Sequence, residues 1–138
     1  MEDQKIPNVI IIDDDSINNY LSETIIHLDF PEAEIHIFTD PQAGLDYLHT
    51  EYTMTTPNKT VLFLDINMPV LSGWDILEIF KNYPDTIKNQ FEIYMFTSSI
   101  AFEDKQRAND NSLVSGFIEK PLSASQLEII FKDLLIKL

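Results

Sequence analysis

Residues 61–73 read Val-Leu-Phe-Leu-Asp-Ile-Asn-Met-Pro-Val-Leu-Ser-Gly. Four consecutive apolar residues run into a single carboxylate, Asp65, and a turn that contains proline and glycine follows it. A short apolar run that is closed by turn residues is typical of a strand buried on both faces, as in a parallel sheet. Open α/β sheets bind ligands at the carboxyl ends of their strands, so Asp65 is a candidate functional residue.

The composition excludes several classes of protein. A chain of 138 residues is most simply one domain. Its formal net charge of −14 leaves no basic surface to neutralise phosphates, so we do not expect direct nucleic-acid binding. There is no cysteine, which excludes disulfides and thiolate metal sites. The N-terminus lacks a signal pattern and no apolar run has membrane-spanning length, so we expect a cytoplasmic protein without membrane contact.

Apolar runs like the first one recur along the chain and alternate with amphipathic segments. The predicted strands are Val9–Ile12, Ala33–Phe38, Val61–Leu64, Phe91–Phe96 and Ser115–Glu119. Five predicted helices alternate with them: one that ends before Pro31, one from Asp40-Pro41, one from Gly73 to before Pro84, one over Ala101–Asn111 and one from Ser123. This alternation predicts an α/β fold with a doubly wound, five-stranded parallel sheet and helices on both faces.

Apolar residues at spacings of three and four predict which helix faces pack inward. In the first helix, which Asp15 or Ser16 would cap, these are Ile17, Tyr20, Leu21, Thr24, Ile25 and Leu28. In the last helix, which a capping box of Ser123 and Gln126 would open, they are Leu127, Ile130, Phe131, Leu134, Leu135 and Leu138. The fourth helix has only Phe102, the Lys105 stem and Ala108, so it should be the least firmly held.

Four of the five predicted strands end in a polar residue: the pair Asp13-Asp14, then Asp65, Thr97 and Lys120. In a parallel sheet the carboxyl ends share one edge, so these side chains should converge there. Three neighbouring carboxylates repel one another unless a cation neutralises them, and hard oxygen ligands favour Mg²⁺. Aspartate can attack phosphorus, and an ammonium and a hydroxyl can bind the phosphoryl oxygens. The pattern predicts phosphorylation of Asp65.

Each of these residues also has an ordinary structural interpretation. Asp65 alone could be a helix N-cap, and Asp13-Asp14-Asp15 could be a solvated cluster of caps. A strand-end Thr97 or a solvated Lys120 is uninformative by itself. The combination of all four positions at one sheet edge favours a functional site.

Four motifs carry a resemblance to a known family. They are Ile11-Ile12-Asp13-Asp14-Asp15-Ser16, Phe63-Leu64-Asp65-Ile66-Asn67-Met68-Pro69 with Ser72-Gly73, Phe96-Thr97-Ser98, and Phe117-Ile118-Glu119-Lys120-Pro121. Over nearly its whole length the chain resembles the receiver domain of two-component response regulators. The resemblance implies a flavodoxin-like sheet with strand order 2-1-3-4-5. It also implies a single receiver domain over residues 1–138, without an effector domain.

The resemblance implies a role for each acidic residue. Asp65 resembles the phosphoacceptor, and Asp14 resembles the direct Mg²⁺ ligand of the acidic pair. Asp13 resembles the partner that holds the metal mainly through water. The backbone carbonyl of Asn67 resembles the third protein ligand. Asp15, next to the pair, is expected to be a helix cap instead.

Further roles follow from the resemblance for residues around the phosphate. Thr97 resembles the switch hydroxyl and Lys120 the phosphate-binding ammonium, with a cis peptide bond after Lys120. Phe117 stands where the family has an aromatic switch residue, although core packing is an alternative for it. The side chains of Asn67 and Ser99 are expected to tune how readily water reaches the acyl phosphate. Neither is an obvious general base, so we expect a moderate phosphoryl lifetime.

The function implied by the resemblance is a signalling switch that catalyses only its own phosphorylation and dephosphorylation. The phosphodonor would be a sensor histidine kinase or a histidine phosphotransfer protein. The face formed by the fourth helix, the fifth strand and the last helix would shift and bind a downstream protein. Ile129 and Ile136 on the last helix could belong to such a surface or to a widened core stripe.

The residues are also compatible with two other functions. A phosphohydrolase of the haloacid dehalogenase type also uses a strand-end aspartate, Mg²⁺, a hydroxyl residue and a lysine, and there Asp13 would be the nucleophile. Its opening motif fits only loosely, and the chain leaves little room for a substrate-binding cap. A binding module that works without phosphorylation would carry no modification at all.

Overall fold

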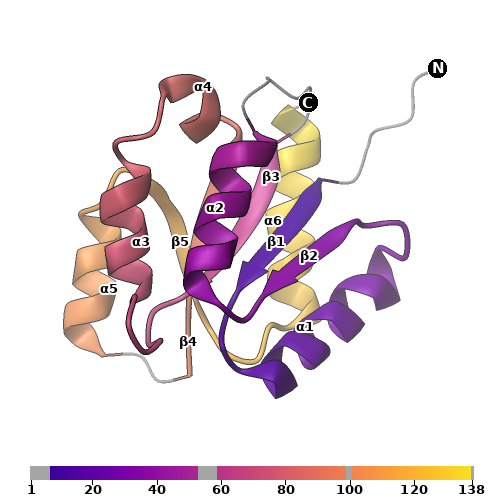
Figure 1. The fold of residues 1–138 in the computed structure, drawn as a ribbon. Helices are drawn as coiled ribbons and strands as arrows, with labels where there is room; N and C mark the ends of the chain where they lie inside the picture. The colour runs from indigo at the N-terminus through magenta and orange to yellow at the C-terminus, as the bar shows by residue number, and fades with distance from the viewer. Residues whose placement is uncertain (1–6, 53–58, 99–100, 138) are drawn as a thin grey trace.

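The computed structural model describes residues 7–52, 59–98 and 101–137, and Figure 1 shows their arrangement. The strands are β1 (Asn8–Ile12), β2 (Ile35–Phe38), β3 (Thr60–Asp65), β4 (Phe91–Thr97) and β5 (Val114–Glu119). The helices are α1 (Ser16–Asp29), α2 (Pro41–Glu51), α3 (Gly73–Phe80), α4 (Asp85–Lys88), α5 (Phe102–Asn109) and α6 (Ala124–Lys137). All neighbouring strands are parallel, in the order β2-β1-β3-β4-β5. The predicted sheet and its strand order are confirmed.

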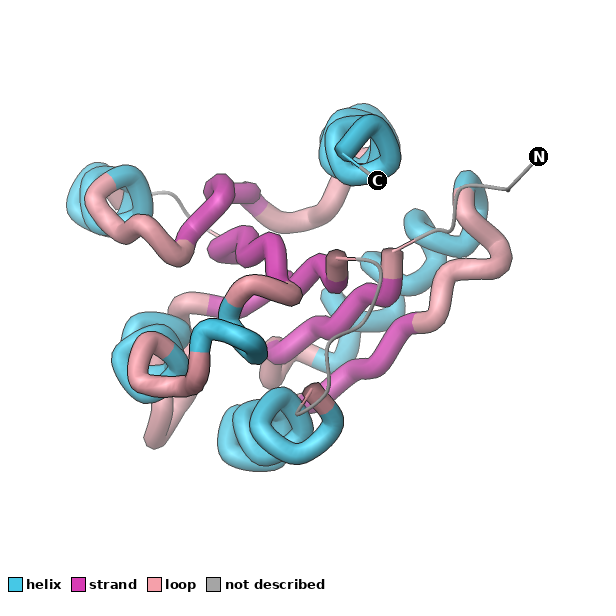
Figure 2. Tube along the Cα trace, turned by 90° about the horizontal axis from the view of Figure 1, so that it is seen from above, coloured by secondary structure: helices cyan, strands magenta, loops and turns pink. Residues whose placement is uncertain are grey.

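The sheet separates two hydrophobic layers, because successive residues of a strand point to opposite faces. Helices α1 and α6 cover one face, and the other helices cover the opposite face (Figure 2). In β1, Ile10 and Ile12 pack towards α2 and α3, whereas Val9 and Ile11 pack towards α1 and α6. All six residues of β3 are buried, as expected for a strand covered on both faces.

The number of helices is the first correction, since the described part of the chain contains six where five were predicted. The additional helix, α4, is a single turn that begins after Pro84 and buries Ile87. Four residues are too few to display a helical period, so no amphipathic pattern marks this turn in the sequence.

The orientation of α1 is the second correction. Its buried residues are Asn18, Asn19, Ser22 and Ile26. Most of the predicted inward stripe faces outward: Ile17, Tyr20 and Leu28 are at least 68% exposed, Leu21 and Thr24 are also exposed, and only Ile25 is partly buried. Asp15 caps the helix through the amides of Ile17 and Asn18. The buried face of α1 therefore consists mainly of polar residues, in place of the predicted apolar stripe.

Of the other two helices with a predicted face, α6 follows the prediction in its described part and α5 does not. In α6 the capping box of Ser123 and Gln126 is present. Its buried stripe consists of Leu127, Ile130, Phe131 and Leu134, while the side chains of Leu135, Ile136 and Leu138 lie outside the described part. In α5, Phe102 was expected to face inward but is 76% exposed, and only Ala108 is buried. The packing of α5 is therefore even thinner than predicted. No helix in the described ranges has the length and apolarity to span a membrane.

Candidate functional site

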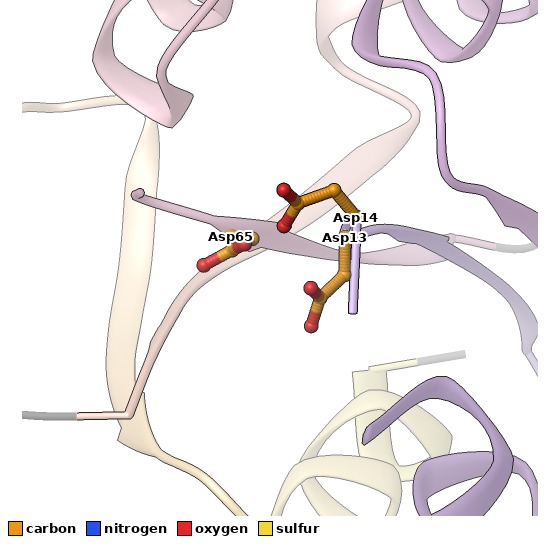
Figure 3. A group of neighbouring side chains, drawn as sticks. All are labelled: Asp13, Asp14 and Asp65. Atoms are coloured by element: carbon orange, nitrogen blue, oxygen red, sulfur yellow. The ribbon is translucent and has the colours of Figure 1, made fainter. Parts of the chain in front are cut away.

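Three carboxylates meet where β1 and β3 end. Asp13 and Asp14 directly follow β1, Asp65 ends β3, and the two strands are hydrogen-bonded neighbours. Each residue offers an oxygen that lies within 4.8 Å of the others, and Figure 3 shows the three side chains together. Asp13 and Asp65 are buried, whereas Asp14 is exposed. The sheet thus brings the predicted acidic residues together.

Lys120 reaches this cluster from the end of β5. Its ammonium lies 2.8 Å from Asp13 Oδ2 and 3.3 Å from Asp65 Oδ1, and its side chain is only 10% exposed. Its backbone amide donates to the carbonyl of Thr97, at 2.6 Å, and the predicted cis peptide bond to Pro121 is present. One ammonium cannot neutralise three carboxylates, so the site retains negative charge that suits a divalent cation.

The buried position of Asp65 changes its acidity. Burial, the largest cause, and the negative charge of Asp13 together raise the pKa of Asp65 to about 7, against the opposing effect of Lys120. For Lys120, burial lowers the pKa, but the hydrogen bond and the charge of Asp13, together with Asp65, raise it above its usual value. Lys120 is therefore a stable cation in this site. A second cation beside Asp65 would favour its ionised form.

Two asparagines hold Asp13 in place, and the sequence analysis missed both. Asn18 Nδ2 donates to Asp13 Oδ2 at 2.9 Å, and Asn19 Nδ2 donates to the Asp13 carbonyl at 2.9 Å. The Asp15 amide donates to Asp13 Oδ1, also at 2.9 Å. Both oxygens of Asp13 are thus engaged by the protein, which leaves the exposed Asp14 more accessible to a metal ion. The sequence signal that could have identified them is two adjacent asparagines near the start of a predicted helix, just after the acidic run.

The loop after Asp65 lies close to its carboxylate. The Asn67 amide donates to Asp65 Oδ1 at 3.3 Å, and the side chain of Asn67 is exposed. The loop then turns back, since the Gly73 amide donates to the Ile66 carbonyl at 3.0 Å. A Cβ on Gly73 would lie 2.5 Å from the Asp65 carbonyl oxygen, so only glycine fits at this close approach.

Neither Asp65 nor Asp13 is a helix N-cap. The N-cap of α3 is Ser72, which forms a capping box with Asp75, so Asp65 does not cap this helix. Asp15 caps α1, as expected for the third residue of the acidic run, and Asp13 does not. Asp13 and Asp65 are buried carboxylates without a capping role.

Three predicted site residues remain: Thr97, Phe117 and Ser99. Thr97 is fully buried at the end of β4 and directly follows Phe96, which is the β-sheet partner of Asp65. Phe117 is partly buried against the core layer that contains Ala108 of α5. This burial is compatible with core packing and with a switch, so its switch role stays a prediction. Ser99 lies outside the described residues.

Comparison with known proteins gives a consistent result. Residues 9–132 match the family described as response regulator receiver domain. A solved two component response regulator from Cytophaga hutchinsonii is 32% identical, with a TM-score of 0.85 over 96% of this chain and 98% of that one. A response regulator receiver protein from Dyadobacter fermentans, 22% identical with a TM-score of 0.82 over 92% and 96% of the two chains, supports the fold alone.

A curated relative is longer than this chain. The heme response regulator HssR of Staphylococcus epidermidis is 28% identical over 134 residues, which cover 93% of this chain and 51% of the relative. The chain thus spans about half the length of the curated relatives it matches. These comparisons confirm the flavodoxin-like fold and give no support to the haloacid dehalogenase alternative with Asp13 as nucleophile.

Proposed function

Because the chain belongs to the family of response regulator receiver domains, we propose that it is a phosphorylation-activated switch of a two-component or phosphorelay system. In this proposal Asp65 accepts the phosphoryl group of a phosphohistidine on a sensor histidine kinase or a phosphotransfer protein. The observation that carries it is the buried Asp65 carboxylate at a strand end, next to two further carboxylates and the Lys120 ammonium. We also propose that residues 1–138 act as one receiver domain in the cytoplasm.

The transfer step follows from the positions of these groups. An Asp65 oxygen attacks phosphorus, an O–P bond forms, and the N–P bond to the donor histidine breaks with the electron pair remaining on the imidazole. Lys120, already 3.3 Å from Asp65, would then bind a phosphoryl oxygen. We assign the hydroxyl of Thr97, at the adjoining end of β4, to a second phosphoryl oxygen. The protein thus acts only on its own carboxylate and is not otherwise an enzyme.

The acidic residues fit a Mg²⁺ ion by the chemistry of their donors. Asp14, Asp65 and the backbone carbonyl of Asn67 would bind it directly, and Asp13 through water, because Asn18, Lys120 and a backbone amide already engage the Asp13 oxygens. When bound, the ion would offset the negative charge of the phosphoryl group and the carboxylates. The exposed Asn67 side chain, beside Asp65, is placed to influence the approach of water and hence the lifetime of the acyl phosphate.

An exposed apolar patch supports a docking surface for the phosphodonor. The α1 patch consists of Ile17, Tyr20, Leu21 and Leu28, which are all exposed. Helix α1 starts at Ser16, two residues after Asp14, so the patch adjoins the acidic site. Exposed apolar patches commonly mark protein-binding surfaces. We therefore place the phosphodonor on α1, where its phosphohistidine can reach Asp65.

The output surface follows from the weak packing of α5. This helix buries only Ala108 and exposes Phe102, so a small change in the preceding β4 segment can displace it at low cost. We propose that phosphorylation shifts α5, β5 and α6 relative to the unmodified form and thereby recruits a downstream protein. Ile129 on α6 is 63% exposed, which supports a contact surface at this residue over a widened core stripe.

The test is phosphorylation with acetyl phosphate and Mg²⁺, followed by mass spectrometry of the intact protein and mapping of the hydroxylamine-labile group. We expect modification of Asp65, loss of modification in Asp65→Asn, and retention in Asp13→Asn at raised Mg²⁺. The exposed Asp133→Asn on α6 is the matched control and should be modified like the unchanged protein. Unchanged labelling of Asp65→Asn would refute the proposal, and no labelling of any form would favour the phosphorylation-independent module.

A further inference from the structure

Helices α3 and α5, which lie side by side in Figure 1, are joined by the side chains of Trp74, Asp104 and Arg107. The indole N–H of Trp74 on α3 donates to Asp104 Oδ1 at 3.1 Å, and the Arg107 guanidinium lies over the indole ring, 4.7 Å from its centroid. Asp104 and Arg107 are separated by one turn of α5 and therefore share one face of it. The indole is only 6% exposed. We call these three side chains the α3–α5 contact.

Little else in the described part of the chain holds α5 in place. The helix buries only Ala108, and no side chain caps its first turn. Among the described residues, the bond from Trp74 to Asp104 is the only hydrogen bond between a side chain of α5 and another helix or strand. A cavity of about 460 Å³, lined by Trp74 and Arg107 among others, adjoins the contact and limits the packing of α5 on α3. The α3–α5 contact is therefore a main restraint on the position of α5.

The α3 side of this contact is fixed to the backbone of Asp65. Gly73, directly before Trp74, donates its amide to the Ile66 carbonyl at 3.0 Å. A Cβ on Gly73 would lie 2.5 Å from the Asp65 carbonyl oxygen, so the start of α3 rests directly on Asp65. Trp74 itself is buried in the core layer on this face of the sheet. Its position is thus tied to that of Asp65.

The α5 side of the contact is connected to the other end of the site. Strand β4 ends at Thr97, which we assign to a phosphoryl oxygen, and α5 begins at Phe102. A movement of Thr97 towards the phosphate is passed along the chain to α5, while Trp74 stays with Asp65. The two sides of the contact are then displaced relative to each other. A hydrogen bond is lost when its donor and acceptor move apart by more than a few tenths of an ångström.

We propose that the α3–α5 contact holds α5 in its unphosphorylated position and opens when Asp65 is phosphorylated. This inference rests on the proposed function, because it names the restraint on the output helix of that switch. A contact that exists in only one of two states stabilises that state, so its removal shifts the equilibrium towards the other. By the same linkage, a protein without the contact binds a mimic of the phosphoryl group more tightly.

Trp74 reports on the contact, because it is the only tryptophan of the chain. Quenching of its emission by acrylamide measures how accessible the indole is. We expect weak quenching in the unmodified protein, and an increase when acetyl phosphate and Mg²⁺ modify Asp65. Asp104→Ala removes the acceptor and should increase quenching without any phosphodonor. Asp104→Asn keeps a carbonyl oxygen that can accept the indole N–H, so its quenching should stay close to that of the unchanged protein.

Glu103→Ala is the matched control, because it removes a carboxylate from the same first turn of α5 at an exposed residue outside the contact. Asp104→Ala should speed amide exchange in α5 about tenfold, as expected for the loss of one hydrogen bond to a charged group. It should also bind beryllium fluoride, a stable mimic of the phosphoryl group, about fivefold more tightly in calorimetry with Mg²⁺. Glu103→Ala should change neither quantity. Circular dichroism checks that each variant is folded.

The outcomes separate this inference from the proposed function. If acetyl phosphate modifies Asp65 but the quenching of Trp74 does not change, the contact does not open and this inference alone is wrong. It is equally wrong if Asp104→Ala and Glu103→Ala bind beryllium fluoride with the same affinity, because the contact is then only structural. If neither acetyl phosphate nor beryllium fluoride acts on Asp65, the proposed function fails and this inference fails with it.

Discussion

At the scale of single residues, the acidity of Asp65 links the site to the stability of the protein. Its pKa is raised from 3.8 to about 7 in the folded protein, chiefly by burial. The folded state therefore binds this proton more tightly than the unfolded state between these pH values. The contribution of Asp65 to the free energy of unfolding is greatest below about pH 4. It decreases as the pH rises towards 7, because the folded protein must then hold a buried negative charge.

We expect Asp65→Asn to stabilise the metal-free protein at pH 8 by roughly 1–4 kcal/mol, since it removes this charge. At pH 4.5 the gain should be small, because Asp65 is then protonated in the folded state. Urea denaturation at both pH values, in the presence of a chelator, measures the difference. A stabilisation that is the same at both pH values would show that burial of the charge is not its cause.

Val70 is a second residue that affects the free energy of unfolding, through strain in its backbone. Its φ angle is 71°, in the left-handed region that a β-branched side chain rarely adopts, and its side chain is almost fully exposed. The loop that follows Asp65 thus contains local strain, without any packing of Val70 that would offset it.

We expect Val70→Gly to stabilise the protein by about 0.5–1 kcal/mol, because relief of the strain exceeds the entropy cost of glycine. Val70→Ala keeps a Cβ at the same position and is the matched control, with a smaller gain. Chemical denaturation at equilibrium measures both variants. The explanation fails if glycine is no more stable than alanine at this position.

At the scale of elements, α1 shows that helix orientation follows from specific contacts. Asn18 and Asn19 contact Asp13 on the buried side of the helix, while Ile17 and Tyr20 face outward. With the asparagines of α1 on Asp13, the apolar residues on the other side of the helix form the exposed α1 patch beside the acidic site.

We expect the double substitution Ile17→Ser with Tyr20→Ser to slow phosphotransfer from a phosphorylated histidine-containing donor about tenfold or more, because exposed apolar anchors of an interface are lost. Phosphorylation by acetyl phosphate should continue at an unchanged rate. Stability should change by less than about 0.5 kcal/mol per residue, since both side chains are exposed.

The control for this experiment is Ile79→Ser on α3, a partly exposed residue on the opposite face of the sheet. It should leave transfer from the protein donor unchanged. An equal loss with acetyl phosphate and with the protein donor would mean that the α1 substitutions damage the acidic site, and the docking role of the patch would then be wrong.

At the scale of the whole molecule, packing density differs between the two sides of β5. Helix α6 buries Leu127, Phe131 and Leu134, whereas α5 buries only Ala108. The lightly packed helix follows the strand that carries Thr97, so a change at the proposed phosphate can reach a weakly held helix along the chain.

We expect the amides of α5 to exchange with deuterium faster than those of α6, and their exchange to change on phosphorylation of Asp65. Mass spectrometry of peptides, with and without acetyl phosphate and Mg²⁺, measures both effects. Asp65→Asn should show the first difference but not the response. Exchange in α5 as slow as in α6, or a response confined to other elements, would contradict the proposed output surface.

The strands and the residues at their ends are readable from the pattern of the chain, whereas the strand order followed from the resemblance to receiver domains. Runs of buried residues mark the strands because a parallel strand is covered on both faces, and such runs are visible without tertiary information. The end of each run then places Asp13, Asp14, Asp65 and Lys120, since parallel strands share one edge. The caps at Asp15 and at Ser123 were also predicted, because capping is a local interaction of the chain with itself.

The folded structure was needed to see which way α1 faces, that α4 exists, and how little α5 buries. Ile17 and Phe102 match an inward pattern, yet both are exposed. Periodicity reports where apolar residues lie around a helix, but which side of the helix packs on the sheet depends on the folded structure. In α1 the buried side carries Asn18 and Asn19, which contact Asp13. The cavity between α3 and α5 has the same origin, because its walls come from segments that only the folded chain brings together.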